Sequence, residues 1–398
     1  MSPISPTPPS ASTLSPIAFP DVALPESTRR LRTEVRAFLD EERARGTVLG
    51  RPDSWLAGWD PGFSRRLAER GWVGMALPTE YGGAGRGFLE RYVVIEELLA
   101  AGAPVSAHWV SDRQAGPSIL QHGTEEQRRF FLPRIAAGRC FFSIGMSEKS
   151  SGSDLASVAT RAERTADGWR LTGTKMWTGG AHCNDYAIVL ARTDETEDKH
   201  AGLSQFIVDL RAPGVRVEPI RLMSGEHRFN ALHLEGVDVP DGMLLGQQGD
   251  GWKQVTGELA FERSGPERYL STFPLLVSLL RELGQHPTTA GQLTRIGILA
   301  ARLYSIRRLS LGVAAALDAG ASPDTQAALV KDLGTRLEGT LIDTVRSILP
   351  TPADPHATPG SHPELLAFAL LHSPGYTLRG GTNEILRGII TRGLEQHR

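Results

Sequence analysis

The sequence has few cysteines, little net charge and no long apolar run. Cys140 and Cys183 are its only cysteines, and neither belongs to a Cys-x-x-Cys pair. A zinc ribbon or a dithiol redox centre is therefore excluded, and no metal site is expected. We interpret the two residues as reduced, buried thiols of a cytoplasmic protein, with a disulfide between them as the less favoured alternative.

The charge balance argues against a nucleic-acid partner, because 43 Lys and Arg residues face 45 Asp and Glu residues. No apolar run approaches the length of about 20 residues that a bilayer crossing requires, so no membrane partner is expected. Residues 1–24 are rich in Pro and Ser and lack the basic and apolar regions of a signal peptide. They are expected to form a disordered or loosely attached tail.

The hydrophobic pattern changes its period twice along the chain. Leu31, Val35 and Phe38 repeat at helical spacing, whereas Tyr186–Leu190 and Phe206–Leu210 are short β-type runs bounded by Gly and Asp. Helical spacing of the apolar residues then resumes and continues to the end of the chain. The order predicts an α+β fold with an N-terminal helical domain, a middle antiparallel β-domain and a C-terminal helical bundle. The expected bounds, after the tail, are 25–137, 138–250 and 251–398.

Two glycine-rich segments in the middle region are candidates for holding a ligand. Phe142–Asp154 places Ser and Gly residues after an expected strand, where backbone N–H groups suit a phosphate or a polar ring edge. In Gly173–Ala181, Trp177 can stack on a planar ring while Thr178 offers a hydroxyl to a ring nitrogen. The structural alternatives are an ordinary hairpin loop and a half-buried core tryptophan. The segment at 82–87, GGAGRG, does not fit a dinucleotide-binding loop.

The helix expected to open at Gly251 carries one charged residue on an otherwise apolar face. Trp252, Val255, Leu259, Glu262 and Pro266 follow one another at steps of three and four residues. A carboxylate on such a stripe is either functional or part of an ion pair. Its neighbour in sequence, the arginine at 263, points about 100° away on a helix. Pro266 should bend the helix.

The C-terminal run GGTNEILRGII spans Gly380–Ile390. Thr382 is a plausible N-cap of an apolar helix, whose N-terminus attracts anions or polar ligand edges. The alternative is a terminal helix that only packs against a neighbour.

Four phrases together carry a family resemblance: LPTEYGGAG, MSEKSSGSD, GTKMWTGGAHCNDYAIVLART and GGTNEILRGII. With them the chain resembles the acyl-CoA dehydrogenase family over nearly its full length. The resemblance implies FAD between the β-domain and the C-terminal helices, α,β-dehydrogenation of an acyl thioester, and electron transfer to an electron-transferring flavoprotein. The implied FAD contacts are Met146, Ser147, Gly152, Ser153, Trp177 and Thr178, with Thr382 and Glu384 serving the flavin of a neighbouring subunit.

The chain departs from the family pattern at the catalytic base. Many members carry a catalytic Glu where this chain has Gly380; others carry it at the position of Glu262, which we therefore expect to be the base. The neighbouring Arg263 is expected to contact the substrate. The backbone N–H of Gly380 remains available to the thioester oxygen.

A second departure concerns the subunit arrangement. The family's Arg-x-x-Phe-Gly phrase and Gly-Gly-x-Gly loop are missing, and Lys149 replaces a usual proline. Similar gaps occur in family members built as heterotetramers. A homotetramer and a heterotetramer with a second dehydrogenase-like chain both remain open.

Three functions are compatible with the sequence. The chain is a dehydrogenase that uses Glu262, a partner-dependent or non-catalytic subunit, or a flavin monooxygenase on the same fold. Glu262 favours the first, because a monooxygenase needs no base for an α-proton. The acyl group, and whether CoA or an acyl-carrier protein bears it, are undetermined; Gly380 removes a side chain that would restrict a bulky, branched or ring-bearing chain.

Overall fold

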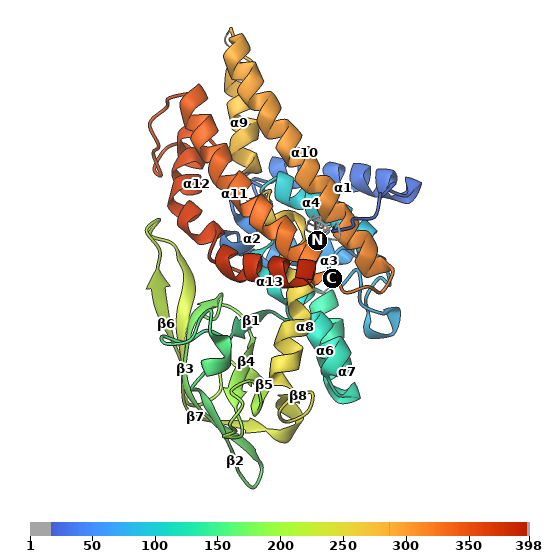
Figure 1. The fold of residues 1–398 in the computed structure, drawn as a ribbon, viewed down its shortest axis with the longest axis vertical. Coiled ribbons are helices and arrows are strands. Elements are labelled where there is room, and N and C mark those ends of the chain that lie inside the picture. The colour runs from blue at the N-terminus through green and yellow to red at the C-terminus, as the bar shows by residue number, and fades with distance from the viewer. Residues whose placement is uncertain (1–16, 286, 396–398) are drawn as a thin grey trace, which may run out of the picture.

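The computed structural model describes residues 17–285 and 287–395, without the side chains of 258–263. Helices precede the sheet in the chain and follow it again. Figure 1 shows most helices of both regions together above the strands, with α6, α7 and α8 beside the strands. The helices before the sheet are α1 (Glu26–Ala44), α2 (Ser54–Ala57), α3 (Pro61–Glu69), α4 (Phe88–Ala100), α5 (Ser106–Val110), the π-helical turn η2 (Ser111–Ala115), α6 (Gly116–His122) and α7 (Glu125–Ala136).

The middle region forms one sheet with the order β6-β7-β3-β2-β4-β5-β8, and β1 pairs with β4. The sheet is mostly antiparallel, as expected, but the β1–β4 and β2–β4 pairs are parallel. Long connections return the chain to β4 in the direction of β1, which a hairpin cannot do. The strands are β1 (Phe142–Gly145), β2 (Arg161–Arg164), β3 (Gly168–Gly179), β4 (Tyr186–Arg192), β5 (Leu203–Asp209), β6 (Val215–Arg221), β7 (His227–Pro240) and β8 (Leu244–Leu245).

The helices after the sheet begin with α8, which Figure 1 shows beside the strands and next to α6 and α7. α10 starts with a capping box, in which Thr289 and Gln292 bond each other's backbone N–H groups. The helices are α8 (Gly251–Arg263), the short η5 (Pro266–Arg268), α9 (Phe273–Leu283), α10 (Ala290–Asp318), α11 (Asp324–Ile348), α12 (His362–Tyr376) and α13 (Asn383–Glu395).

The two helical regions share one apolar core, although the 114 residues of the segment 137–250 separate them in the chain. Side chains of α1 and α4, such as Val35 and Val94, belong to the same buried cluster as Leu337 and Leu366 of α11 and α12. A second cluster fills the sheet's own interior, and a third joins α6 and α7 to the sheet through Ile119, among others. The sheet therefore packs against a single helical body, and the boundary between them is where the candidate site lies.

Two expectations differ from the structure. Residues 17–24 of the expected loose tail pack on α10, where Val22 is buried and its carbonyl oxygen accepts a hydrogen bond from Arg308 (2.8 Å). Apolar residues of this segment therefore gain a partner surface that a composition argument misses. Pro266 does not bend α8, because the helix ends at Arg263 and Pro266 begins η5 instead. None of the helices in the described ranges combines the length and apolarity of a membrane span.

Candidate functional site: two glycine-rich segments on the sheet

A buried ion pair fastens the Ser- and Gly-rich segment after β1 to the sheet. Lys175 of β3 has no exposed surface, and its Nζ donates to Glu148 (2.8 Å) and to the carbonyl oxygen of Met146 (3.1 Å). Glu148 also accepts hydrogen bonds from the backbone N–H groups of Ala159 and Thr160 (2.7 and 2.9 Å). The segment is thereby held at both of its ends.

The surroundings of this ion pair lower the pKa of both Lys175 and Glu148. Burial lowers the pKa of Lys175 to about 8, against the opposing effect of Glu148. Burial by itself would raise the pKa of Glu148, but the attraction of Lys175 and the hydrogen bonds hold that pKa below its usual value. Both side chains are therefore charged at neutral pH, and removing either would leave the other buried without compensation.

The same ion pair brings the two glycine-rich segments together. The carbonyl oxygen of Ser147 accepts a hydrogen bond from the backbone N–H of Met176 (2.7 Å), the residue before Trp177. Met146 packs with Trp252 and Val255 at the start of α8. Ser153 is exposed, and a side chain at Gly152 would meet no atom within 4 Å, so this end of the loop is open to a ligand.

Trp177 and Thr178 form an irregular turn at the end of β3. Trp177 has φ +60° and its side chain is 55% exposed, although a tryptophan rarely takes either state without a reason. Its indole meets the ring of Phe229 edge-on at 6.0 Å. Thr178 is fully buried, and its hydroxyl has no hydrogen-bond partner.

These features fit a flat heterocyclic ligand such as the ring system of FAD. The exposed indole offers an apolar face, and the adjacent hydroxyl is a donor without a protein acceptor. Buried polar groups of native proteins are normally satisfied, so an orphaned hydroxyl beside an exposed aromatic ring indicates a missing partner. The structure thus brings together Met146, Ser147, Trp177 and Thr178, and their role as flavin contacts stays a prediction.

Candidate functional site: the helical side

The C-terminal run starts with two glycines at positive φ, Gly380 at +67° and Gly381 at +83°. The hydroxyl of Thr382 accepts a hydrogen bond from the backbone N–H of Ile385 (3.4 Å), as expected for an N-cap. Glu384 lies exposed in the first turn of α13. Within the described part of the chain, no hydrogen bond joins this run to the turn at Trp177 and Thr178. The expectation that Thr382 and Glu384 serve another subunit stays a prediction.

The space left by the missing side chain at Gly380 is already occupied. A Cβ atom built on Gly380 would lie 2.9 to 3.2 Å from the guanidinium of Arg268. Arg268 is 1% exposed; it lies 3.6 Å from the carboxylate of Glu267 and over the ring of Trp55. The expectation that Gly380 opens room for a bulky acyl chain is therefore not met in this state of the protein, because an arginine fills that room.

A small cavity follows directly after α8. Its volume is about 40 Å³, and it lies between α4, α10 and the turn that connects α8 to η5. Among its lining residues, Arg113 is buried and pairs with Glu267 (2.9 Å), and burial lowers the pKa of Arg113 to about 10. This volume holds no more than a few water molecules, so an acyl chain could enter only if side chains moved. The sequence analysis missed Arg113 and Arg268, because nothing local distinguishes them from surface arginines.

The expected base and its neighbour, Glu262 and Arg263, fall within the bounds of α8. Their side chains lie outside the described residues, so their roles stay predictions. Of the two cysteines, Cys140 is buried and Cys183 is partly buried, and both are free thiols. Burial raises the pKa of Cys140 to about 12, which keeps it an unreactive thiol.

Candidate functional site: similarity to known proteins

This fold and this pair of glycine-rich segments define a class. The model of the acyl-CoA dehydrogenase N-terminal domain matches residues 25–139, and that of the middle domain matches residues 143–239. The chain belongs to the acyl-CoA dehydrogenase family, whose members are FAD-dependent oxidoreductases.

Several relatives come from Mycobacterium tuberculosis. Acyl-CoA dehydrogenase FadE26 is 34% identical over 348 residues, which are 82% of this chain and 84% of that protein. Acyl-CoA dehydrogenase FadE29 is 41% identical over 199 residues, and acyl-CoA dehydrogenase FadE34 is 33% identical over 325 residues. The matched regions are 51% of FadE29 and 44% of FadE34, about half the length of those two relatives.

Solved structures show the same fold over nearly the whole chain. The Tcur3481-Tcur3483 steroid ACAD superposes with a TM-score of 0.82 at 30% identity and covers 93% of this chain and 98% of its own. The ChsE4-ChsE5 complex from Mycobacterium tuberculosis gives a TM-score of 0.78 at 29% identity and covers 93% and 97%. The name of each structure joins two protein designations, and the second is described as a complex.

Proposed function

We propose that the chain is an acyl-CoA dehydrogenase that introduces a double bond between the α and β carbons of an acyl thioester. The observation that carries the proposal is the turn at Trp177 and Thr178, where an exposed indole adjoins a buried hydroxyl without a partner. The residues that would hold FAD are Met146, Ser147, Gly152, Ser153, Trp177 and Thr178. When bound, FAD supplies the acceptor for the β-hydride.

The other chemical roles fall to the helical side of the site. Glu262 takes up the α-proton, since Gly380 stands where many relatives carry the alternative carboxylate. The backbone N–H of Gly380 donates to the thioester oxygen and stabilises the negative charge that develops there. Arg263 contacts the substrate. The electrons then leave to an electron-transferring flavoprotein.

The substrate is a CoA or carrier-protein thioester whose acyl group we place in the ring-bearing class. The support is the similarity to a structure described as a steroid ACAD, which the chain matches over 93% of its length. Entry of such a group requires the cavity after α8 to widen, since its present volume is about 40 Å³.

A second candidate is a subunit that binds flavin and acts only within a heterotetramer. Two observations favour it: related structures contain two named subunits, and this chain lacks the Arg-x-x-Phe-Gly phrase that grips the flavin of a neighbour. In this arrangement Thr382 and Glu384 contact a flavin on the partner chain.

A visible spectrum tests both candidates. The chain is purified alone and after co-expression with a dehydrogenase-like gene neighbour, and each preparation is titrated without oxygen with a panel of linear, branched and ring-bearing acyl-CoAs. Flavin bands and their bleaching by a ring-bearing acyl-CoA in the first preparation support the dehydrogenase acting alone. Bands only in the second support the heterotetramer, and no flavin in either contradicts both.

A further inference from the structure

The turn at Trp177 and Thr178 rests on residues of the neighbouring strand β7 that no sequence pattern singles out. Asn230 is fully buried, and its Nδ2 donates to the carbonyl oxygen of Thr178 (3.0 Å). The carbonyl oxygen of Arg228 accepts a hydrogen bond from the backbone N–H of Gly180 (2.9 Å). Two residues of β7 thus hold the turn from both of its sides.

The side chain of Asn230 is itself fixed by two stacked histidines. His227 donates from Nε2 to the amide oxygen (2.6 Å), and Nδ1 of His182 lies 3.2 Å from the amide nitrogen. The two imidazole rings are 3.8 Å apart and nearly parallel. The amide can therefore take only the orientation in which it donates to the turn.

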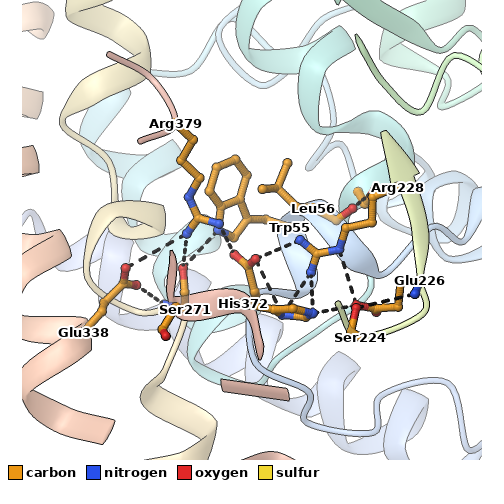
Figure 2. Close-up of polar contacts among 12 residues, drawn as sticks. Trp55, Leu56, Ser224, Glu226, Arg228, Ser271, Glu338, His372 and Arg379 are labelled. Carbon is orange, nitrogen blue, oxygen red and sulfur yellow. Dashed lines mark hydrogen bonds and ion pairs between the residues drawn. The ribbon is translucent and has the colours of Figure 1, made fainter. Parts of the chain in front are cut away.

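Arg228 connects this strand to both helical regions, as Figure 2 shows. Its side chain is 6% exposed. Nη1 donates to Asp53 just before α2 (2.9 Å), and Nη2 lies 3.0 Å from Nδ1 of His372 in α12. The third neighbour is Glu226 on its own hairpin, 3.7 Å from Nε.

The partners of Arg228 are held in turn by other charged groups. His372 hydrogen-bonds Glu226 through Nε2 (2.5 Å), and Arg379 donates to the second oxygen of Asp53 (2.6 Å). Asp53 has a left-handed φ of 58° and a backbone N–H bonded to the carbonyl oxygen of Ser271. Separating a buried guanidinium from its fixed partners would cost much of the free energy that stabilises the fold. The helices therefore set the position of β7 at Arg228.

We propose that Arg228 is a positioning residue for the flavin site, which makes the geometry of the turn at Trp177 and Thr178 depend on the docking of both helical regions against the sheet. The inference rests on the proposed function, because it assigns FAD to that turn. A turn fixed in advance loses less entropy when the ligand binds and so binds it more tightly. Loss of the Arg228 contacts should therefore weaken FAD binding by more than an equal loss of fold stability elsewhere in the protein would.

The test compares Arg228→Met with Arg66→Met. Arg66 likewise donates twice to one buried carboxylate, that of Glu42 (2.7 and 2.6 Å), but α3 and α1 carry this pair, remote from the turn. In the preparation that holds flavin, FAD dissociation constants, the visible spectrum of bound flavin and thermal midpoints are measured. We expect Arg228→Met to weaken FAD binding about tenfold or more and to shift the flavin bands. Arg66→Met should change affinity by less than about twofold at a similar loss of midpoint.

Arg228→Lys decides the matter if Arg228→Met does not fold. Lysine keeps the charge but lacks the planar fork that reaches Asp53 and His372 together. We expect a several-fold weaker FAD complex and a midpoint close to that of the unchanged protein. Wild-type affinity and spectrum in Arg228→Lys, or equal effects of Arg228→Met and Arg66→Met on affinity, overturn the inference. A wild-type protein without flavin in either preparation overturns the proposed function as well.

Discussion

The two sides of the candidate site are built differently. On the sheet side, the ion pair of Lys175 and Glu148 holds the loop, and the exposed indole of Trp177 adjoins the buried hydroxyl of Thr178, which has no hydrogen-bond partner. On the helical side, Arg268 fills the space at Gly380, and the neighbouring cavity measures only about 40 Å³. If the proposed function holds, the sheet side is ready for its ligand, whereas the helical side must rearrange before a substrate can enter.

The strongest test of this contrast removes the buried ion pair that holds the loop on the sheet side. Lys175→Met leaves Glu148 buried without its cation, which should destabilise the protein by about 3–5 kcal/mol and abolish flavin binding. The measurement is urea unfolding together with flavin content. Lys199→Met is the matched control, because its pair with Asp154 in the same loop is exposed and should change stability by less than about 1 kcal/mol. Equal losses in the two variants would show that the loop is not held by the buried pair.

On the helical side, the largest effect should come from the base. Glu262→Gln keeps the size of the side chain and removes its proton acceptor, so flavin reduction by substrate should slow by on the order of 10²-fold or more. FAD content should stay the same, because the sheet side is untouched. Stopped-flow reduction without oxygen measures the rate. A wild-type rate would place the base elsewhere, with a carboxylate of a partner subunit as the next candidate.

The stability of the junction between the two sides should depend on pH, because Glu338 of α11 titrates there. Burial raises its pKa to about 7, against the opposing charge of Arg379 at 4.0 Å and a hydrogen bond from the N–H of Ser271. The folded state thus binds a proton more tightly than the unfolded state does. The resulting stability is complete below the ordinary carboxyl pKa and is lost as pH rises to about 7.

Glu338→Gln mimics the protonated form and should remove this component of the pH dependence. Thermal midpoints of the two proteins, measured between about pH 5 and 8, should converge at the acid end and separate at the alkaline end, with the variant the more stable. Parallel curves would show that Glu338 does not titrate in this range.

The smallest expected effect probes the hydroxyl of Thr178. Thr178→Val removes a buried polar group without a partner, so the flavin-free protein should be as stable as before or slightly more stable. FAD binding should weaken by about 0.5–1.5 kcal/mol, the usual contribution of one hydrogen bond. Thr178→Ser retains the hydroxyl and should restore affinity. A valine variant with unchanged affinity would show that the hydroxyl does not contact the ligand.

A feature could be predicted from the sequence where residues close in the chain determine it, and could not where distant residues do. The glycine-rich segment that carries Trp177 and the cap at Thr382 depend on neighbours in the chain, so local patterns indicated both, but not the positive φ of Trp177. Arg228 could not be recognised, since its partner Asp53 is 175 residues away in the chain. Pro266 was assigned to α8 by periodicity alone, although a proline also begins a new helix.

Because Arg268 lies against Gly380, the residue types at these two positions should vary together among related sequences. A carboxylate at 380 would need a Cβ atom within 3.2 Å of the guanidinium, on a backbone with φ +67° that favours glycine. A carboxylate at 380 would therefore require the guanidinium of Arg268 to move, and a smaller residue at 268 would make room for it. Among related sequences, we expect a side chain at 380 and an arginine at 268 to exclude one another.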